Sequence, residues 1–113
     1  MTVTLFHNPK CSTSRKALEL LRERGVEPVV VEYLKVGWDA ATLDRLAQRT
    51  GVGLSGLLRR REARATELLE SNASDDVIRA GMIADPVLVE RPIVETEKGA
   101  RIGRPVETIL DLI

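Results

Sequence analysis

Cys11 is the residue of this chain whose type and setting most directly indicate chemistry. It lies between a short β-rich segment and a segment with helical periodicity, among small polar residues rather than apolar ones. The N-terminus of a helix presents unpaired N–H groups and a partial positive charge, which lower the pKa of a thiol and bind oxyanions. A free cysteine is also often a small buried hydrophobe. The polar, turn-forming neighbours favour a reactive thiol over that alternative.

The loop around Cys11 supplies further polar groups. Its small hydroxyl side chains leave room for the backbone to face a ligand, and they can donate hydrogen bonds to a thiolate. We expect His7 to add positive charge near the sulfur or to act in catalysis, although a histidine that ends a strand is more often structural. The residues expected to support the thiol are Asn8, Ser12, Thr13, Ser14 and Arg15.

The single cysteine excludes several kinds of site. No intramolecular disulfide and no cysteine-based zinc site can form, and we expect no metal. No second cysteine follows Cys11 at the C-x-x-C spacing, so the chain holds no dithiol redox pair. Arg15 follows too closely for the C-x5-R loop of tyrosine-phosphatase-like enzymes. A redox cycle through Cys11 therefore needs an external thiol.

Three arginines in turns or at the ends of expected elements are candidates for binding an anion: Arg59, Arg91 and Arg104. The guanidinium group is a planar fork that suits oxyanions, although most arginines are solvated surface residues. Arg91 is the most specific of the three because Pro92 follows it. A proline entering a strand sits at its start or at an edge, and a cis bond before it would direct Arg91 toward whatever the cysteine loop faces.

The N-terminal third of the chain has the pattern of a β-α-β unit. Residues 2–6 are expected to form a strand, residues 14–24 a helix capped by Ser12 or Thr13 and stopped by Gly25, and residues 27–34 a second strand. The near-continuous apolar run of the second strand indicates a parallel pair that is buried on both faces.

The middle of the chain is predicted to be helical. Asp39 and Ser74 are suited to cap helices, and residues 54–58 are expected to form a short helical turn before the basic run at 59–64. Three short strands are then expected at residues 87–89, 92–96 and 100–102. Pro105 is expected to open a C-terminal helix at its first position, with apolar residues at helical spacing from Val106 to Ile113. This order predicts a single α/β domain over residues 1–113, with a helical insertion at about residues 38–84.

Composition excludes some partners. Lys and Arg total 17, as do Asp and Glu, so the formal net charge is zero, which argues against binding nucleic acid or an anionic membrane through the whole protein's charge. The longest apolar run is too short to span a membrane, and the N-terminus has no signal-peptide pattern. A lone thiol is easiest to keep reduced in the cytosol. We therefore expect a cytoplasmic protein that binds neither nucleic acid nor membrane.

Four segments together resemble the glutaredoxin-coupled arsenate reductases: HNPKCSTSRKALELL at residues 7–21, LLRRRE at 57–62, RPIV at 91–94 and GRPVETIL at 103–110. The resemblance implies a thioredoxin-like fold with a mixed sheet and a helical insertion. It implies that Cys11, aided by His7, attacks arsenate, that the three arginines bind the oxyanion, and that Pro92 is a cis proline beside the active cysteine. It also implies glutathione as co-substrate, glutaredoxin as reducing partner, and no tightly bound cofactor.

Two other functions occur on similar sequences. One is a transcriptional regulator resembling the Spx group, which binds RNA polymerase and in many members carries a C-x-x-C redox switch; here Ser14 occupies the second position of that motif. The other is a paralogue that does not act on arsenate and handles glutathione mixed disulfides. The presence of Arg59, Arg91 and Arg104 favours arsenate reduction over both.

Overall fold

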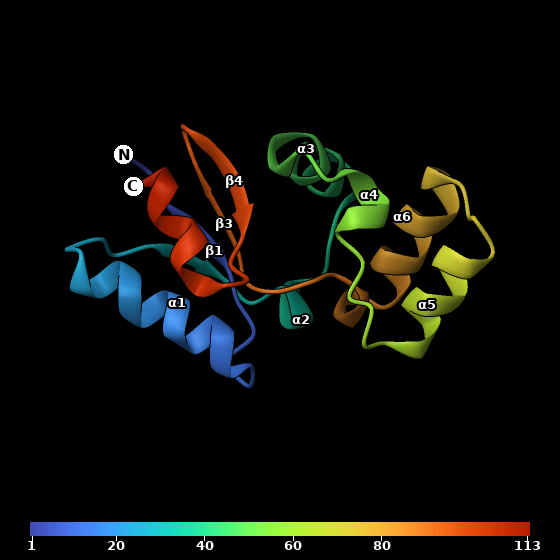
Figure 1. The fold of residues 1–113 in the computed structure, drawn as a ribbon, viewed down its shortest axis with the longest axis horizontal. Coiled ribbons are helices and arrows are strands. Elements are labelled where there is room, and N and C mark those ends of the chain that lie inside the picture. Colours follow the sequence, from blue (N-terminus) through green and yellow to red (C-terminus); the bar gives the residue numbers. More distant parts are fainter. The chain divides into compact units, whose positions relative to one another are not determined.

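The computed structural model describes all residues, 1–113, and divides them into two compact units (Figure 1). The first unit combines Met1–Val36 with Arg91–Ile113, and the second comprises Gly37–Glu90. The helical segment expected at about residues 38–84 falls within the second unit. None of the helices combines the length and the apolar character that crossing a membrane requires.

The first unit is built on a four-stranded mixed sheet with the strand order β2-β1-β3-β4. Strand β1 (Thr4–Phe6) pairs in parallel with β2 (Val29–Val31) and antiparallel with β3 (Ile93–Thr96), which forms a hairpin with β4 (Gly99–Ile102). The parallel pair predicted from the β-α-β pattern is confirmed, as is the α/β class.

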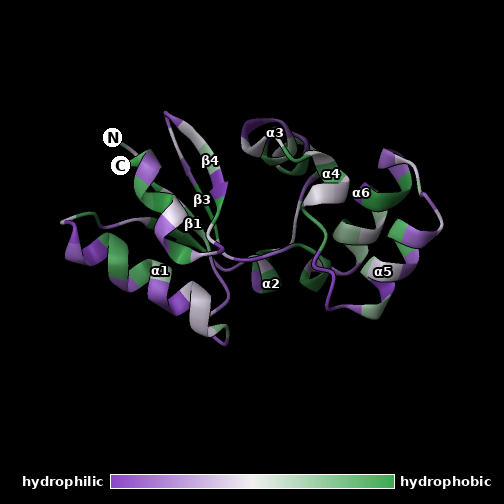
Figure 2. Cartoon of the chain, viewed as in Figure 1, coloured by the Kyte–Doolittle hydropathy of each residue, from purple (hydrophilic) through white to green (hydrophobic).

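The core of the first unit lies between the sheet and two helical segments, α1 (Ser12–Glu23) and the 3-10 helix η2 (Val106–Leu112). Apolar and charged residues alternate around α1 at helical spacing, so one face is apolar and the other hydrophilic (Figure 2). The fully or nearly fully buried side chains of this cluster are Val3, Leu5, Ala17, Leu21, Val94, Ile109 and Leu112. This packing fixes the start of α1 against the end of β1, where Cys11 lies.

Four expectations for the first unit are wrong. Strand β2 is not buried on both faces: it is an edge strand, and Val29 is 56% exposed. Helix α1 begins one residue after Cys11, which is itself the N-cap residue, without a side-chain cap from Ser12 or Thr13. The C-terminal helix is a 3-10 helix with Pro105 as its N-cap residue rather than its first residue. The strand expected to continue to residue 34 instead turns into the short helix α2 (Tyr33–Val36).

The second unit is helical, with α3 (Ala40–Thr50), α4 (Gly53–Gly56), α5 (Ala63–Glu70), α6 (Asp75–Ala84) and the 3-10 helix η1 (Pro86–Leu88). Both predicted caps are confirmed: the Asp39 carboxylate accepts from the backbone N–H of Thr42, and the Ser74 hydroxyl accepts from that of Val77. Helix α5 was not expected from the sequence, where residues 59–64 were interpreted only as a basic run.

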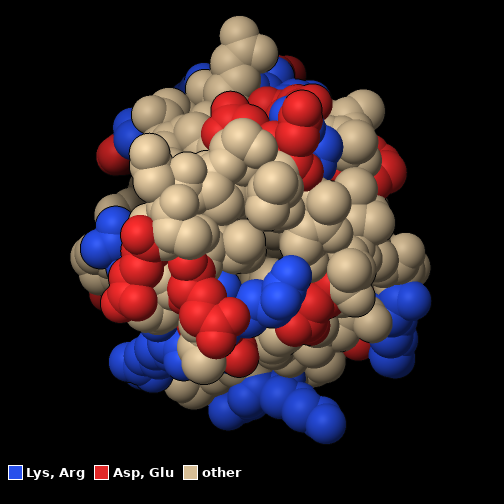
Figure 3. Space-filling view, turned by 90° about the vertical axis from the view of Figure 1, so that its right-hand side faces the viewer, with Lys and Arg blue, Asp and Glu red and all other residues tan.

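The strand expected at residues 87–89 is wrong as well. Most of it belongs to η1, and Val89 makes only an isolated bridge to Leu58. The molecular face drawn in Figure 3 carries basic and acidic side chains interspersed with uncharged ones, so no patch of one sign covers it.

Candidate functional site

The Cys11 thiol lies in the turn between β1 and α1. Its backbone N–H donates to the carbonyl of Asn8 at 3.0 Å, and its carbonyl accepts from the N–H of Arg15 at 3.0 Å. The first bond closes the turn, and the second begins the hydrogen bonding of α1. Cys11 is free and partly exposed. The sulfur is thus held at a helix N-terminus while remaining open to a reactant, as the sequence analysis expected.

The pKa of the Cys11 thiol lies below its ordinary value. Partial burial alone raises it, but three donors outweigh that effect: the backbone N–H of Ser14, the Arg91 guanidinium and the backbone N–H of Thr13. The positive charge of Arg91 lowers the pKa further. Hydrogen bonds and positive charge favour the charged form of the group they contact. The surroundings of Cys11 therefore favour its thiolate form more than water does.

Strand register brings Arg91 and Arg104 to this thiol. Ile93 pairs with both Phe6 and Ile102. The end of β1, the start of β3 and the end of β4 therefore lie side by side at the same end of the sheet. Arg91 lies two residues before Ile93 on the β3 side of the hairpin, and Arg104 lies two residues after Ile102 on the β4 side. The Nη2 atom of Arg104 lies 3.5 Å from the sulfur, and its Nε donates to the carbonyl of Arg91 at 2.8 Å.

The two segments that carry these arginines pack closely against each other at Pro92 and Gly103. The peptide bonds before Pro92 and Pro105 are both cis; the sequence analysis considered a cis bond only at the first. The Gly103 N–H donates to the Pro92 carbonyl at 2.8 Å. A Cβ atom on Gly103 would lie 2.9 Å from the Pro92 Cγ atom, closer than real Cβ atoms approach. Gly103 was part of a recognised motif, but only the packing against Pro92 shows why a glycine stands there.

His7 is almost completely buried and does not add positive charge to the site. Burial lowers its pKa, and although Glu32 acts in the opposite direction, Arg15 and Arg22 lower it further. The imidazole is therefore neutral at neutral pH, which corrects the expectation of a cationic His7. Its Nδ1 atom shares a hydrogen bond of 2.7 Å with the Ser14 hydroxyl, whose direction depends on the tautomer.

The remaining loop residues tie the turn together. The Ser14 hydroxyl, fully buried, also accepts from the backbone N–H of Asn8 at 3.1 Å. The Asn8 side-chain oxygen accepts from the N–H of Lys10 at 3.0 Å, and Arg15 donates to the carbonyl of Pro9 at 2.9 Å. Asn8, Ser14 and Arg15 thus support the loop through their side chains, and Thr13 acts through its backbone. Ser12 is exposed.

Arg59 belongs to the second unit and is held there by carboxylates. It is buried, its Nη1 atom lies 3.0 Å from a Glu90 oxygen, and its Nε atom lies 3.8 Å from a Glu62 oxygen. Its backbone N–H donates to the Leu88 carbonyl at 2.7 Å. No pattern in the sequence indicates the pairing with Glu90, because the two residues are far apart in the chain. Of the three candidate arginines, the structure places Arg91 and Arg104 at the sulfur of Cys11 within one unit.

Comparison with known proteins gives consistent similarities. The model of the ArsC family matches residues 6–112. "Uncharacterized protein YfgD" from Escherichia coli (strain K12) is 44% identical, covering 98% of this chain and 96% of that protein. "Arsenate reductase" from Rhizobium meliloti (strain 1021) is 37% identical, covering 100% of this chain and 82% of that protein. A solved structure of an arsenate reductase from Vibrio cholerae is 40% identical with a TM-score of 0.92, covering 100% and 98% of the two chains. Similarity thus extends over the whole region that contains Cys11 and the three arginines.

Proposed function

Since this chain belongs to the ArsC family and has a thioredoxin-like α/β fold, we propose that it is an arsenate reductase with Cys11 as its nucleophile. The observation that carries the proposal is the contact of two guanidinium groups, from Arg91 and Arg104, with one activated and partly exposed thiol. The family relationship supports arsenate as the substrate, and the two guanidinium groups at the sulfur support the binding of an oxyanion there.

Arsenate is a tetrahedral anion, and a thiolate that approaches it meets electrostatic repulsion. Guanidinium groups bind such oxyanions through charge-assisted hydrogen bonds, which are partly bidentate. Arg91 and Arg104 would offset the charge that accumulates as sulfur and arsenic approach. The resemblance adds Arg59 to this set. His7 acts in this proposal as a positioning residue, since it is neutral and bonded to Ser14.

The proposed reaction uses two thiols to supply two electrons. The Cys11 thiolate attacks arsenic(V), a sulfur–arsenic bond forms, and one arsenic oxygen leaves as water after protonation. Glutathione then attacks the Cys11 sulfur; the sulfur–arsenic bond breaks, its electron pair reduces arsenic to arsenic(III), and arsenite leaves. The resulting mixed disulfide between Cys11 and glutathione is reduced by glutaredoxin. The chain has no second cysteine, so the second thiol comes from outside.

The proposal is tested by a coupled assay with arsenate, glutathione and glutaredoxin, following arsenite release. We expect turnover for the wild type and none for Cys11→Ser, whose fold is checked by circular dichroism. An inactive wild-type protein whose Cys11 still exchanges with glutathione disulfide would overturn the arsenate proposal. It would favour the paralogue that handles glutathione mixed disulfides.

A further inference from the structure

A shallow groove adjoins the thiol within the first unit. It has a volume of about 300 Å³ and is lined by Thr13, Lys16, Arg104, Pro105, Val106 and Glu107. Two of these residues also contact the Cys11 sulfur, Thr13 through its backbone N–H and Arg104 through its Nη2 atom. The groove therefore lies between the N-terminal part of α1 and the segment Arg104–Glu107, which includes the start of η2, and two of its lining residues touch the sulfur.

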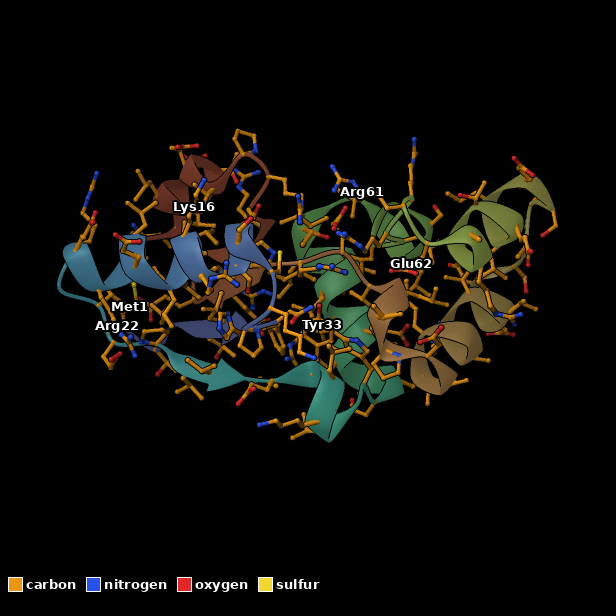
Figure 4. All side chains as sticks on the ribbon, turned by 90° about the horizontal axis from the view of Figure 1, so that it is seen from below. Met1, Lys16, Arg22, Tyr33, Arg61 and Glu62 are labelled. Carbon is orange, nitrogen blue, oxygen red and sulfur yellow. The ribbon has the colours of Figure 1, made fainter.

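The charges of the groove are mixed in a specific way. Lys16, labelled on α1 in Figure 4, and Arg104 provide two cations, whereas Glu107 on η2 provides one carboxylate. This set complements a ligand end that carries both a carboxylate and an ammonium group. A purely cationic thiol would meet two like charges, and an uncharged thiol would use none of them. The volume lies at the lower limit of small-molecule sites, which suits part of a short peptide.

We propose that this groove binds the zwitterionic amino-acid end of glutathione, with its carboxylate on Lys16 and Arg104 and its ammonium on Glu107. The thiol of the bound tripeptide is thereby directed at the Cys11 sulfur. For arsenate reduction this inference rests on the proposed function, because the groove would hold the glutathione that attacks the Cys11 sulfur. The groove would also bind glutathione disulfide during thiol–disulfide exchange with Cys11, a reaction that needs no arsenate.

That exchange provides the experiment. The Cys11 thiolate attacks one sulfur of glutathione disulfide; a Cys11–glutathione disulfide forms, the original disulfide breaks, and glutathione thiolate leaves. Its rate is measured by mass spectrometry and divided by the rate with bis(2-hydroxyethyl) disulfide, which is neutral. We expect Lys16→Gln to lower this ratio about threefold to fivefold, the size of one exposed charge interaction. Lys16→Glu lowers it further and raises the relative rate with cystamine, which is cationic.

Lys10→Gln is the matched control. Lys10 is exposed and immediately precedes Cys11, yet it does not line the groove. We expect it to change the ratio less than Lys16→Gln does. Equal effects of the two variants, or a Lys16→Gln variant that slows both disulfides alike, would overturn the groove proposal. Arsenate turnover is measured separately, so an intact groove effect in a protein without arsenate turnover refutes only the proposed function.

Discussion

Arginines in the two units are neutralised in different ways. In the second unit, Arg59 is buried and paired with the carboxylates of Glu90 and Glu62. In the first unit, Arg104 donates to a backbone carbonyl and to the Cys11 sulfur, and Arg91 donates to the same sulfur. The guanidinium group of Arg59 is thus paired with carboxylates, whereas those of Arg91 and Arg104 contact the sulfur of Cys11.

This difference shows that residue type and motif do not by themselves assign a role. All three arginines occur in recognised motifs, but their surroundings predict different effects when each is removed. Loss of an arginine at the sulfur affects chemistry, and loss of an arginine in a buried ion pair affects stability first. The variants below test this contrast.

The largest effect is expected for Arg91→Gln. Removal of one positioned donor from a charge-stabilising site typically costs about 10²–10³-fold in turnover, and we expect that loss in arsenate kcat/KM. The variant also loses a donor that lowers the pKa of Cys11, so its alkylation rate should rise at higher pH than in the wild type. The wild-type midpoint should lie below about 8.5, the ordinary thiol value. Unchanged turnover and an unchanged alkylation profile would contradict the assignment of Arg91.

Arg59→Gln is expected to act first on stability. The variant removes a charged partner of Glu90 from a largely buried ion pair and should lower the free energy of unfolding by about 2–3 kcal/mol. Urea denaturation measures this loss, and Arg91→Gln serves as the comparison. Combination with Glu90→Gln should recover part of the loss, because the two residues are directly coupled. Strictly additive effects of the two substitutions would show that the pair contributes nothing.

Gly103→Ala tests the backbone approach that supports the arginines. The added Cβ atom would meet Pro92 at 2.9 Å and Ile109 at 3.3 Å, and we expect a loss of about 1–2 kcal/mol from overpacking. Turnover should also decrease, since Pro92 adjoins Arg91. Gly81→Ala is the matched control on α6: its nearest contact, Leu68, lies at an ordinary 3.4 Å, so thermal denaturation should show no comparable loss. A stable, fully active Gly103→Ala protein would contradict the role of this contact.

The smallest expected effect concerns His7 and pH. Its pKa in the folded protein is lowered by burial, so the unfolded chain binds more protons than the folded one between that lowered pKa and about 6.5, the ordinary histidine value. Stability should therefore decrease as the pH falls below about 6.5, and His7→Asn should weaken this dependence. Urea midpoints between pH 5 and pH 7.5 measure it. Parallel pH profiles for the two proteins would contradict the assignment of a buried, neutral His7.

Much of the site could have been derived from register alone. Strands were expected at residues 92–96 and 100–102, and an antiparallel hairpin of these two strands places Arg91 opposite Arg104. The sequence did not predict that this hairpin pairs with β1, nor in which register. That depends on the pairing of Phe6 with Ile93, which residues far apart in the chain form.

Several local features followed directly from the order of the residues: Cys11 between strand and helix, the caps at Asp39 and Ser74, and the parallel pairing of the first two strands. Each depends on contacts between near neighbours or on hydrophobic periodicity. Three other properties became visible only in the folded chain: β2 is an exposed edge strand, the last helix is a 3-10 helix, and His7 is buried and neutral. These properties depend on what packs against each segment, and distant parts of the chain supply those neighbours.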